Sequence, residues 1–460
     1  MTNRDFSSLA LDSELLSNLP SLGYEYMTPI QEQSLPHILA GNDIIAQGKT
    51  GSGKTAAFGL GLLTKLDKSN FHVQSLVLCP TRELTDQVAN ELRRLARTIP
   101  NVKVLTLCGG LPFGPQAESI ASGVHIIIGT PGRVEDHLRK RTLNLGTLKI
   151  IVLDEADRML DMGFQETLDT IIEQVPKQRQ TLLFSATFPS NIKSIAKRIM
   201  NNPVKLHVES VHDNITIKQH FYKVRDANKV AVLCKLILQS DFESVLIFCN
   251  TRLETQRVAD ELSTAGFSAL ALHGDFDQRD RTQTLVRFSN RSAQILVATD
   301  VAARGIDIDS LDAVINFQIA TSPDMHVHRI GRTGRAGQTG IAITLFSEKD
   351  AYKAVILQES LGRDLVNEPL PALPGLITSP SKATMTTLLI SAGKRQKIRP
   401  GDVLGALTGE SEITGSQVGK IDIFNNRTYV AINREIVKLA IKKLADGKIK
   451  GRHFRVRAIY

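Results

Sequence analysis

Two short stretches of the sequence carry residues suited to phosphate chemistry. The octapeptide GKTGSGKT, from Gly48 to Thr55, fits the pattern G-x-x-x-x-G-K-[ST]. Its glycines let backbone N–H groups surround a β-phosphate, Lys54 can reach the β- and γ-phosphates, and the Thr55 hydroxyl can ligate Mg²⁺. Farther along, Asp154 and Glu155 end the apolar run KIIVL. The first carboxylate suits Mg²⁺, partly through water, and the second can activate an attacking water.

These residues need a scaffold that brings distant segments together, and the apolar pattern supplies one. Short β-branched runs alternate with helical patterns in two blocks, which is typical of parallel sheets buried on both faces. The first block contains NDIIAQ, QSLVLCP, VKVLTLC, VHIIIGT, KIIVLDE and QTLLFSAT; the second contains SVLIFCN, ALALHG, QILVATD, AVINFQ and GIAITLF. An extended link is expected near residues 202–218 and a proline-rich one at NEPLPALPGLITSPSK. Asp154 and Glu155 could also cap a helix, but the upstream phosphate motif favours metal binding by Asp154 and activation of water by Glu155.

The third block, from about residue 384, follows a different plan. The order of its segments is βαββαβ, which is the plan of an RRM. Residues 391–460 hold 15 Lys and Arg against 6 Asp and Glu, so the rest of the chain, with 41 of each, is neutral. Excess positive charge confined to one segment indicates a polyanionic partner.

The order of the motifs resembles that of DEAD-box RNA helicases, from Phe6 to about Phe346. The tetrapeptide Asp154-Glu155-Ala156-Asp157 is the name-giving motif of that family. The resemblance implies an α/β chain with two tandem RecA-like parallel-sheet domains followed by a small α+β RRM-like domain. The expected boundaries are residues 1–205 for the N-terminal helicase domain with the Q motif, P-loop, DEAD and SAT, 216–365 for the C-terminal helicase domain, 366–383 for a linker and 384–460 for the RRM-like domain.

The resemblance also implies residues for the nucleotide site, with ATP and Mg²⁺ as cofactors. The family's arginine fingers correspond to Arg332 and Arg335 in HRIGRTGR, so Lys54, Asp154, Glu155 and these two arginines are the expected catalytic group, with Thr55 and Asp154 at the metal. Coupling of hydrolysis to strand separation is expected of Asp157, Ser185, Thr187 and His328. The expected ATP-binding residues are Phe6 and Gln31 at the adenine, Gly48, Lys49, Thr50, Gly51, Ser52, Gly53, Lys54 and Thr55 in the loop, and Asp307.

RNA contacts are expected in both helicase blocks and in the third block. In the helicase blocks they are Pro80, Thr81, Arg82, Gly110, Thr130, Pro131, Gly132, Arg133, Gln278, Arg281, Thr299 and Gly305. In the third block they are Lys394, Arg395, Lys397, Arg399, Lys448, Lys450, Arg452, Arg455 and Arg457. The segment RTYVAI keeps only Tyr429 of the usual stacking aromatics, which favours recognition of a folded RNA shape through phosphates. In HFRVRAIY, Phe454, Val456 and Ala458 share one strand face and Arg455 and Arg457 the other.

The third block resembles the C-terminal domain of a bacterial branch of the family that acts on ribosomal RNA. That resemblance implies a helicase that binds a 23S rRNA hairpin and remodels rRNA in the pre-ribosomal large subunit. The alternatives are a general mRNA or cold-stress helicase, an ATP-gated RNA clamp, a DNA helicase, and an RRM-like fold used for protein contact. A cytoplasmic location is expected, since no apolar run reaches the roughly 18 residues of a membrane span and the four Cys have no paired spacing. The chain is also expected to be a monomer.

Overall fold

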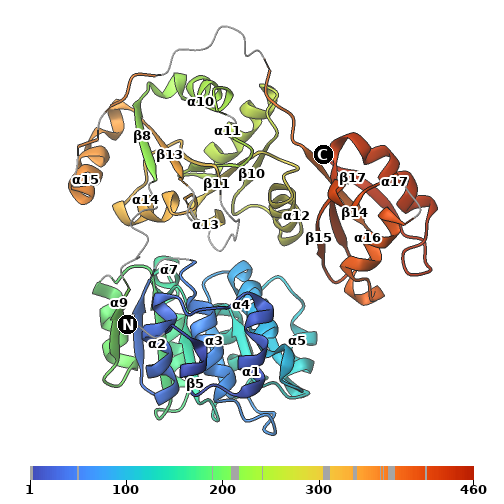
Figure 1. The fold of residues 1–460 in the computed structure, drawn as a ribbon. Coiled ribbons are helices and arrows are strands. Elements are labelled where there is room, and N and C mark those ends of the chain that lie inside the picture. The colour runs from blue at the N-terminus through green and yellow to red at the C-terminus, as the bar shows by residue number, and fades with distance from the viewer. Residues whose placement is uncertain are drawn as a thin grey trace. The chain divides into compact units, whose positions relative to one another are not determined.

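The computed structural model describes residues 4–48, 51–188, 190–208, 217–240, 242–303, 311–334, 339–362, 364–365, 367–370, 379–409 and 412–460. It divides into two units, one containing residues 4–208 and the other the described residues from 217 onward. Figure 1 labels the elements along the chain.

The first unit is built on a parallel sheet of seven strands in the order β3-β4-β2-β5-β6-β1-β7. The strands are β1 (Ile44–Gln47), β2 (Ser75–Leu78), β3 (Val104–Leu107), β4 (Ile126–Gly129), β5 (Ile150–Leu153), β6 (Gln180–Ser185) and β7 (Val204–His207). The six apolar runs of the first block are β1 to β6. Strand β7 lies in the segment where the sequence predicts an extended link, and it pairs with β1 at the edge of the sheet.

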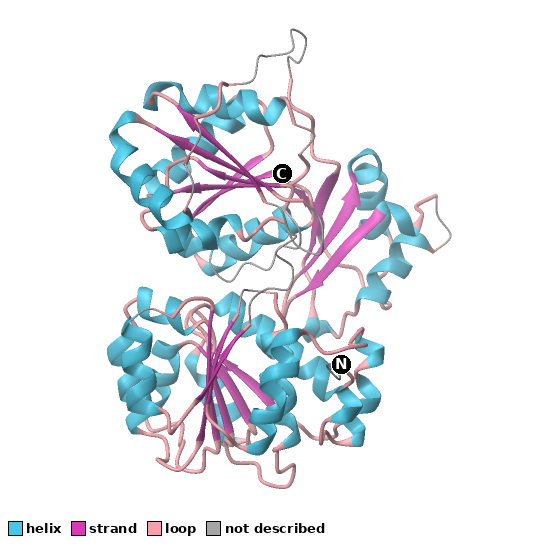
Figure 2. Ribbon diagram, turned by 60° about the vertical axis from the view of Figure 1, so that its left-hand side comes forward, coloured by secondary structure: helices cyan, strands magenta, loops and turns pink. Residues whose placement is uncertain are grey.

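Helices cover both faces of this sheet, as Figure 2 shows. One face packs against α1 (Ser13–Asn18), α2 (Pro29–Ala40), α3 (Lys54–Thr64) and α4 (Arg82–Leu95), and the other against α6 (Pro131–Arg139), α7 (Ala156–Asp161), α8 (Gln165–Glu173) and α9 (Ser190–Ile199). Helix α5 (Phe113–Ala121) follows β3. In β5, Ile150 and Val152 enter one core while Ile151 and Leu153 enter the other. Burial on both faces explains why these strands are apolar without interruption.

The second unit contains a parallel sheet of six strands in the order β10-β11-β9-β12-β13-β8. The strands are β8 (Lys218–Lys223), β9 (Val245–Cys249), β10 (Ala269–Leu272), β11 (Ile295–Thr299), β12 (Ala313–Asn316) and β13 (Ile341–Phe346). The helices are α10 (Lys229–Leu238), α11 (Arg252–Thr264), α12 (Gln278–Ser289), α13 (Asp300–Ala303), α14 (Pro323–Ile330) and α15 (Ala351–Leu361). The five apolar runs of the second block are β9 to β13, and β8 is an additional edge strand.

The second unit also holds the RRM-like domain, whose strands are antiparallel in the order β15-β16-β14-β17. Its elements follow the expected βαββαβ sequence: β14 (Met385–Ile390), α16 (Pro400–Thr408), β15 (Val418–Ile423), β16 (Thr428–Asn433), α17 (Val437–Asp446) and β17 (Val456–Ile459). The helices pack on one sheet face through a core that includes Leu388, Val430 and Leu444. The predicted fold class is confirmed: two parallel-sheet domains precede a small α+β domain.

The opposite face of the RRM-like sheet packs against helix α12. Leu389, Tyr429 and Ile459 form a buried cluster with Val286 of that helix. Thr387 in β14 lies 2.5 Å from Ser292, oxygen to oxygen. The buried apolar cluster and the buried hydrogen bond keep this sheet face covered by α12 and away from solvent.

Within the described residues, no helix combines the length and the apolar character that a membrane span requires.

Candidate nucleotide and RNA site

The phosphate-binding loop leaves the carboxyl end of β1 and enters α3. Lys54 is buried and its Nζ donates to the carbonyl of Gly48 at 2.7 Å, so the lysine curls back over the loop. Gly53 precedes the helix with φ +93°, a left-handed conformation that favours glycine. Helix α3 begins at Lys54, directly after the loop, and the contact of this lysine with phosphate remains a prediction. Lys49 and Thr50, also predicted to bind ATP, lie outside the described residues.

Thr28 and Gln31, in the Q-motif segment, hydrogen-bond to the backbone of this loop. Gln31 is fully buried; its Nε2 donates to the carbonyl of Gly53 at 3.1 Å, and its Oε1 accepts from Thr28 N at 2.9 Å. The Thr28 hydroxyl donates to the carbonyl of Ser52 at 2.8 Å. A Cβ on Gly53 would lie 2.6 Å from the Gln31 amide nitrogen, so only glycine fits there. Gln31 therefore supports the phosphate loop directly.

Phe6, predicted to stack on adenine, lies in the core of the first unit. It is 4% exposed and meets Tyr24 edge-on, with ring centroids 6.4 Å apart. The contact places it on the side of the unit that carries the Q motif. Its role at an adenine remains a prediction.

Asp154 and Glu155 follow β5, two strands from the phosphate loop in the sheet. Burial raises the pKa of Asp154 to about 7, while the Lys54 ammonium opposes that rise. Glu155 has φ +52°, and its carboxylate forms a buried ion pair with Arg158 at 2.9 Å. Asp154 thus lies within electrostatic reach of Lys54, and Glu155 is held by a side chain that the sequence analysis did not identify.

The donor set suits Mg²⁺ better than a metal held by protein ligands alone. No three His, Cys, Asp or Glu side chains gather as a metal site within the part of the chain that the structure describes. Mg²⁺ is bound by one or two carboxylates together with substrate phosphates and water. A buried carboxylate near Lys54 and Thr55 fits that mode.

Asp157 joins the DEAD segment to the SAT segment after β6. Its Oδ2 accepts hydrogen bonds from Thr187 N and Thr187 Oγ1, each at 2.9 Å, and from Ala186 N at 3.2 Å. Its own N–H donates to Ser185 Oγ at 3.3 Å. The structure therefore brings together three of the four residues predicted to couple hydrolysis to RNA.

The predicted RNA contacts of the first unit gather at the carboxyl ends of β2, β3 and β4, which are neighbours in the sheet. Arg82, at the start of α4, lies over the glycine pair: a Cβ on Gly110 would lie 2.0 Å from its Nη1. Thr81 and Thr130 are the residues before α4 and α6. This grouping places hydroxyls, helix starts and cations along one edge.

Arg133 is positioned by a network that the sequence analysis missed. Its Nη1 donates to Gln116 Oε1 at 2.8 Å and to the carbonyl of Leu111 at 3.0 Å. The same Gln116 oxygen lies 3.1 Å from His137 Nε2, and His137 Nδ1 lies 2.8 Å from Thr142 Oγ1. Because an amide oxygen only accepts, Nε2 carries the proton. Gln116 lies in α5, far from Arg133 in sequence, so no local pattern reveals the pair.

We expect the first unit to lose stability as pH falls below about 6.5, in part through His137. Burial lowers the pKa of this imidazole to about 4, with Arg133 adding to the effect. Between those values the unfolded chain binds a proton that the folded unit does not, so acid favours unfolding. Thermal unfolding of wild type and His137→Gln at about pH 7.5 and about pH 5 tests this. Between the two pH values, the Tm of His137→Gln should fall less than that of wild type. His72→Gln, which changes an exposed histidine, should show the same fall as wild type. Equal falls in all three proteins would contradict the assignment.

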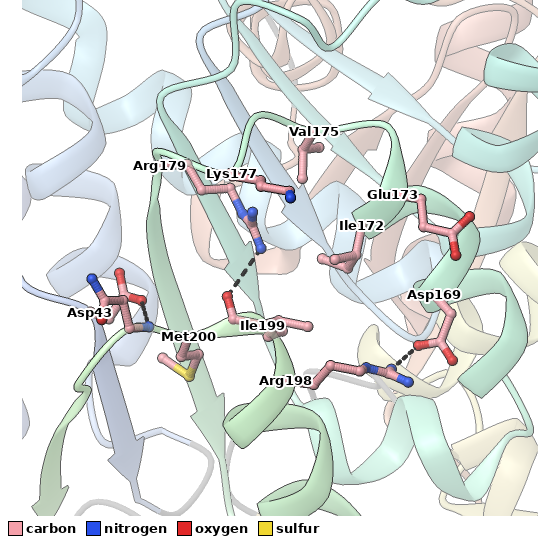
Figure 3. A pocket seen from close by; sticks show the side chains of 11 residues that line it. Asp43, Asp169, Ile172, Glu173, Val175, Lys177, Arg179, Arg198, Ile199 and Met200 are labelled. Carbon is pink, nitrogen blue, oxygen red and sulfur yellow. Dashed lines mark hydrogen bonds and ion pairs between the residues drawn. The ribbon is translucent and has the colours of Figure 1, made fainter.

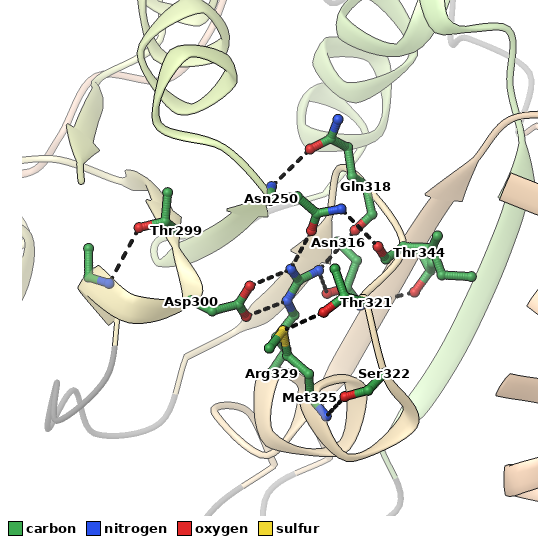
Figure 4. A network of polar contacts seen from close by, with 12 residues as sticks. Asn250, Thr299, Asp300, Asn316, Gln318, Thr321, Ser322, Met325, Arg329 and Thr344 are labelled. Atoms are coloured by element: carbon green, nitrogen blue, oxygen red, sulfur yellow. Dashed lines mark hydrogen bonds and ion pairs between the residues drawn. The ribbon is translucent and has the colours of Figure 1, made fainter. Parts of the chain in front are cut away.

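Arg329 is the centre of the polar network in the second unit (Figure 4). It is 1% exposed and makes a two-pronged ion pair with Asp300, Nε to Oδ1 at 2.6 Å and Nη2 to Oδ2 at 2.7 Å. It also donates to Asn250 Oδ1, Asn316 Oδ1 and the Gln318 carbonyl. It ties together the ends of β9, β11 and β12, whereas the sequence analysis singled out only its neighbours.

The other described residues predicted for this unit lie on β11, on α12, on α14 or just after α14. Arg332 is 7% exposed and His328 is in α14. Arg281 of α12 donates to the carbonyl of Ala302 at 2.7 Å, Thr299 Oγ1 accepts from Ala302 N, and Gln278 begins α12. Gly305, Asp307 and Arg335 lie outside the described residues.

Two loops of the RRM-like domain carry most of its predicted cationic residues. Lys394 and Arg395 donate their backbone N–H groups to the carbonyls of Phe424 and Asn425, at 2.8 and 3.0 Å. Lys450 Nζ donates to the carbonyl of Lys397 at 3.0 Å, which joins the loop after β14 to the one before β17. The nine predicted cations are all exposed: Lys394, Arg395, Lys397, Arg399, Lys448, Lys450, Arg452, Arg455 and Arg457.

The aromatic residues of this domain are arranged differently from those of an RRM that stacks bases on its sheet. Tyr429 is 2% exposed, because it packs against α12, so its ring is closed to bases. Phe424 is 39% exposed, beside the basic loop. Phe454, Val456 and Ala458 pack on the domain core while Arg455 and Arg457 face solvent, which is the alternation expected from the sequence.

A further cavity of the first unit, of about 590 Å³, lies at the amino ends of β1 and β6, away from the phosphate loop (Figure 3). Its charged lining pairs cations with carboxylates, as in the ion pair of Arg198 with Asp169. Arg179 donates to the carbonyls of Pro176 and Ile199, and Asp43 accepts from Thr181 N and Asn201 N. These contacts anchor strand ends, and we assign this cavity no part in the nucleotide site.

Two tandem parallel-sheet domains, the first with a phosphate loop and a buried Asp-Glu pair, define a helicase-type P-loop ATPase. Residues 28–195 match the DEAD/DEAH box helicase family, 228–337 the helicase conserved C-terminal domain, and 387–458 the DbpA RNA binding domain. The chain belongs to the DEAD/DEAH box helicase family. It is therefore an enzyme, a helicase whose last domain is an RNA-binding domain.

Relatives resemble the chain over different lengths. "ATP-dependent RNA helicase DbpA" of Escherichia coli (strain K12) is 51% identical, covering 99% of each chain. "DEAD-box ATP-dependent RNA helicase CshA" of Bacillus licheniformis is 40% identical, covering 83% of this chain and 78% of that protein. Among solved structures, S. cerevisiae Dbp5 bound to RNA and ADP BeF3 has TM-score 0.71 and 30% identity, covering 78% of this chain and 94% of that one. The resemblance to DbpA includes the RRM-like domain.

Proposed function

We propose that this RNA helicase binds a structured hairpin of 23S ribosomal RNA through its RRM-like domain and remodels rRNA in the pre-ribosomal large subunit. The observation that carries the proposal is the surface of that domain. Its excess cations are exposed on two joined loops, whereas the sheet face is covered by α12. Such a surface suits the phosphates and shape of a folded RNA better than a run of stacked bases. The 51% identity to DbpA of Escherichia coli, over 99% of this chain, supports the same conclusion.

In this proposal the first unit hydrolyses ATP with Mg²⁺. Lys54 and the loop amides hold the phosphates, and Thr55 and Asp154 hold the metal, which would supply positive charge at the γ-phosphate. Glu155 accepts a proton from the attacking water, and Arg332 and Arg335 stabilise charge on the transferred phosphoryl group. Phe6, Gln31 and Asp307 complete the nucleotide contacts. The bonds of Asp157 to Thr187 support its role, with Ser185 and His328, in coupling hydrolysis to RNA.

The remaining assignments concern RNA and the organisation of the chain. The helicase domains, residues 1–205 and 216–365, would hold RNA through contacts to its sugar-phosphate backbone. Residues 384–460 would determine which RNA is bound. We propose a cytoplasmic monomer. Four free cysteines, three of them buried, support a reducing compartment.

A general RNA helicase, acting on mRNA or cold-stabilised structures, is the alternative. The CshA relatives are named as RNA helicases without a stated target, and their matches cover 80–83% of this chain. The two functions differ in selectivity for the RNA that stimulates ATP hydrolysis, which can be measured directly.

We expect the hairpin to stimulate ATP hydrolysis at lower concentration than an unrelated RNA of equal length. Changing Lys394, Arg395 and Lys397 together to Gln should weaken hairpin binding and flatten its log–log salt dependence by roughly 0.7–0.9 per lost phosphate contact. The ATPase rate at saturating RNA should persist, because the three changed side chains are not among the proposed nucleotide contacts. ATPase titrations with both RNAs at several salt concentrations provide the measurement.

A double change of Lys438 and Lys442 to Gln on α17 is the matched control, because both side chains are exposed and lie outside the two loops. It removes nearly the same charge and should leave hairpin binding near the wild-type level. Equal stimulation of the wild-type chain by both RNAs would remove the hairpin assignment and favour the general helicase.

A further inference from the structure

A basic pocket opens beside the contact between α12 and the RRM-like sheet. The pocket has a volume of about 220 Å³ and lies beside the buried cluster of Val286, Leu389, Tyr429 and Ile459. Its lining comes from the second helicase domain, including Ser268, Arg287 and Ser292, and from the segment that enters and ends the RRM-like domain, including Lys382, Thr386 and Arg434. Hydrogen bonds of Gln294 to Ser381 and Lys420 to Ser289 join the same two parts. The pocket therefore exists only while the two parts are docked.

The charged side chains of the lining are all cationic. Arg287, Lys382 and Arg434 contribute three cations, and none of the lining residues is Asp or Glu. The lining of the Figure 3 cavity, by contrast, contains three cations and three carboxylates. Three like charges around a small pocket repel one another and are stabilised by an anion between them.

Arg287 points to the nature of that anion. Its Nε is buried without a hydrogen-bond partner among the described residues, and burial lowers the pKa of its guanidinium. An arginine retains its charge and presents donors in a fork that matches phosphate. Arg434 keeps donors available too, since its described bond is a long one, 3.4 Å, to the carbonyl of Ala383. Serine and threonine hydroxyls in the lining add further donors.

We propose that this pocket, formed by Arg287, Lys382 and Arg434, binds a backbone phosphate of the RNA that the RRM-like domain holds. The proposal rests on the proposed function to the extent that this domain anchors RNA. The phosphate neutralises the three cations and ties the second helicase domain to the RRM-like domain, so RNA binding favours the docked arrangement.

The position of Arg287 on α12 favours RNA over a free phosphate ion. The same helix carries Gln278 and Arg281, the predicted RNA-backbone contacts of the second helicase domain, at its other end. Arg281 and Arg287 are six residues apart, or about 9 Å along the axis. In this proposal, a strand bound at the first contact continues past the second to the anchored RNA.

The test compares full-length wild type with Arg287→Gln and Lys382→Gln. The probe is a hairpin with a single-stranded extension, and the readout is the salt dependence of its equilibrium binding. Each variant should bind more weakly, with a log–log slope flatter by about 0.7–0.9. The control is Arg291→Gln, an exposed arginine next to α12 that pairs with Glu243 and does not line the pocket; it should keep the wild-type slope. Lys382 is exposed, so its variant carries the test if Arg287→Gln is unstable.

The outcomes separate this proposal from the proposed function. Wild-type slopes in both variants overturn the pocket assignment, whichever RNA the chain prefers. Flatter slopes without preference for the hairpin over an unrelated RNA leave the pocket standing and remove the hairpin function. Thermal unfolding in inorganic phosphate provides a third arm: stabilisation of wild type but not of Arg287→Gln, with unchanged RNA slopes, would assign the pocket to free phosphate and overturn the RNA proposal.

Discussion

A Glu155→Gln variant is expected to bind ATP and RNA but to hydrolyse ATP about 10²–10⁴ times more slowly than wild type. The amide keeps the size and polarity of the side chain but cannot accept the proton of an attacking water. The backbone of Glu155 is fixed at the end of β5, with φ +52°, next to buried Asp154. Its contact with Arg158 holds the carboxylate in one direction. The measurement is steady-state ATPase at saturating RNA, together with binding of a fluorescent nucleotide.

Loss of the Arg158 partner needs a control, because an unpaired buried arginine lowers stability. Thermal unfolding should show the first unit still folded at the assay temperature. Glu173→Gln, an exposed carboxylate in α8, removes the same charge away from the site and should hydrolyse ATP at the wild-type rate. If Glu155→Gln keeps more than about a tenth of the wild-type rate, Glu155 is not the general base.

Most of the sheet architecture could be predicted because its signal is local. Each buried parallel strand is a short apolar run, and all eleven expected runs became strands. Strands β7 and β8 were missed because they lie at sheet edges, where one side is solvated: VKLH alternates half-buried and exposed residues. Such strands form through pairing with β1 and β13, far away in sequence.

The site was predictable where a motif sets the chemistry, and not where partners come from distant segments. GKTGSGKT and DEAD predict Lys54 as a phosphate contact and Asp154 as a metal contact, because phosphate and metal binding fix residue type and spacing. Nothing local indicates that Gln116 orients Arg133, or that Tyr429 is covered by α12. The latter contact changes the interpretation of the RRM-like domain: its missing aromatics are explained by a sheet face that packs on protein.

Arg329 shows the same limit most clearly, and its replacement should have the largest effect on stability. Arg329→Ala leaves Asp300 as a largely buried carboxylate without its cation, and removes donors from Asn250 and Asn316. Breaking a buried pair in this way costs about 3–5 kcal/mol. For a unit of this size the expected fall in Tm is roughly 6–20 °C. The Tm of Arg329→Lys should lie between those of wild type and Arg329→Ala, because an ammonium keeps the charge but cannot make the two-pronged contact.

Calorimetry of the full chain can test this, because the network lies entirely in the second unit. The transition of that unit should move to lower temperature while the transition of the first unit stays in place. Arg252→Ala removes an exposed ion pair with Asp275 in the same unit and should change stability by less than about 1 kcal/mol. A transition unmoved in Arg329→Ala would mean that the ends of β9, β11 and β12 hold together without the arginine. Arg332 and His328 lie in the same segment as Arg329. If the transition is lowered, we also expect Arg329→Ala to lose ATPase activity at temperatures at which the unit is still folded, because these two side chains are misplaced.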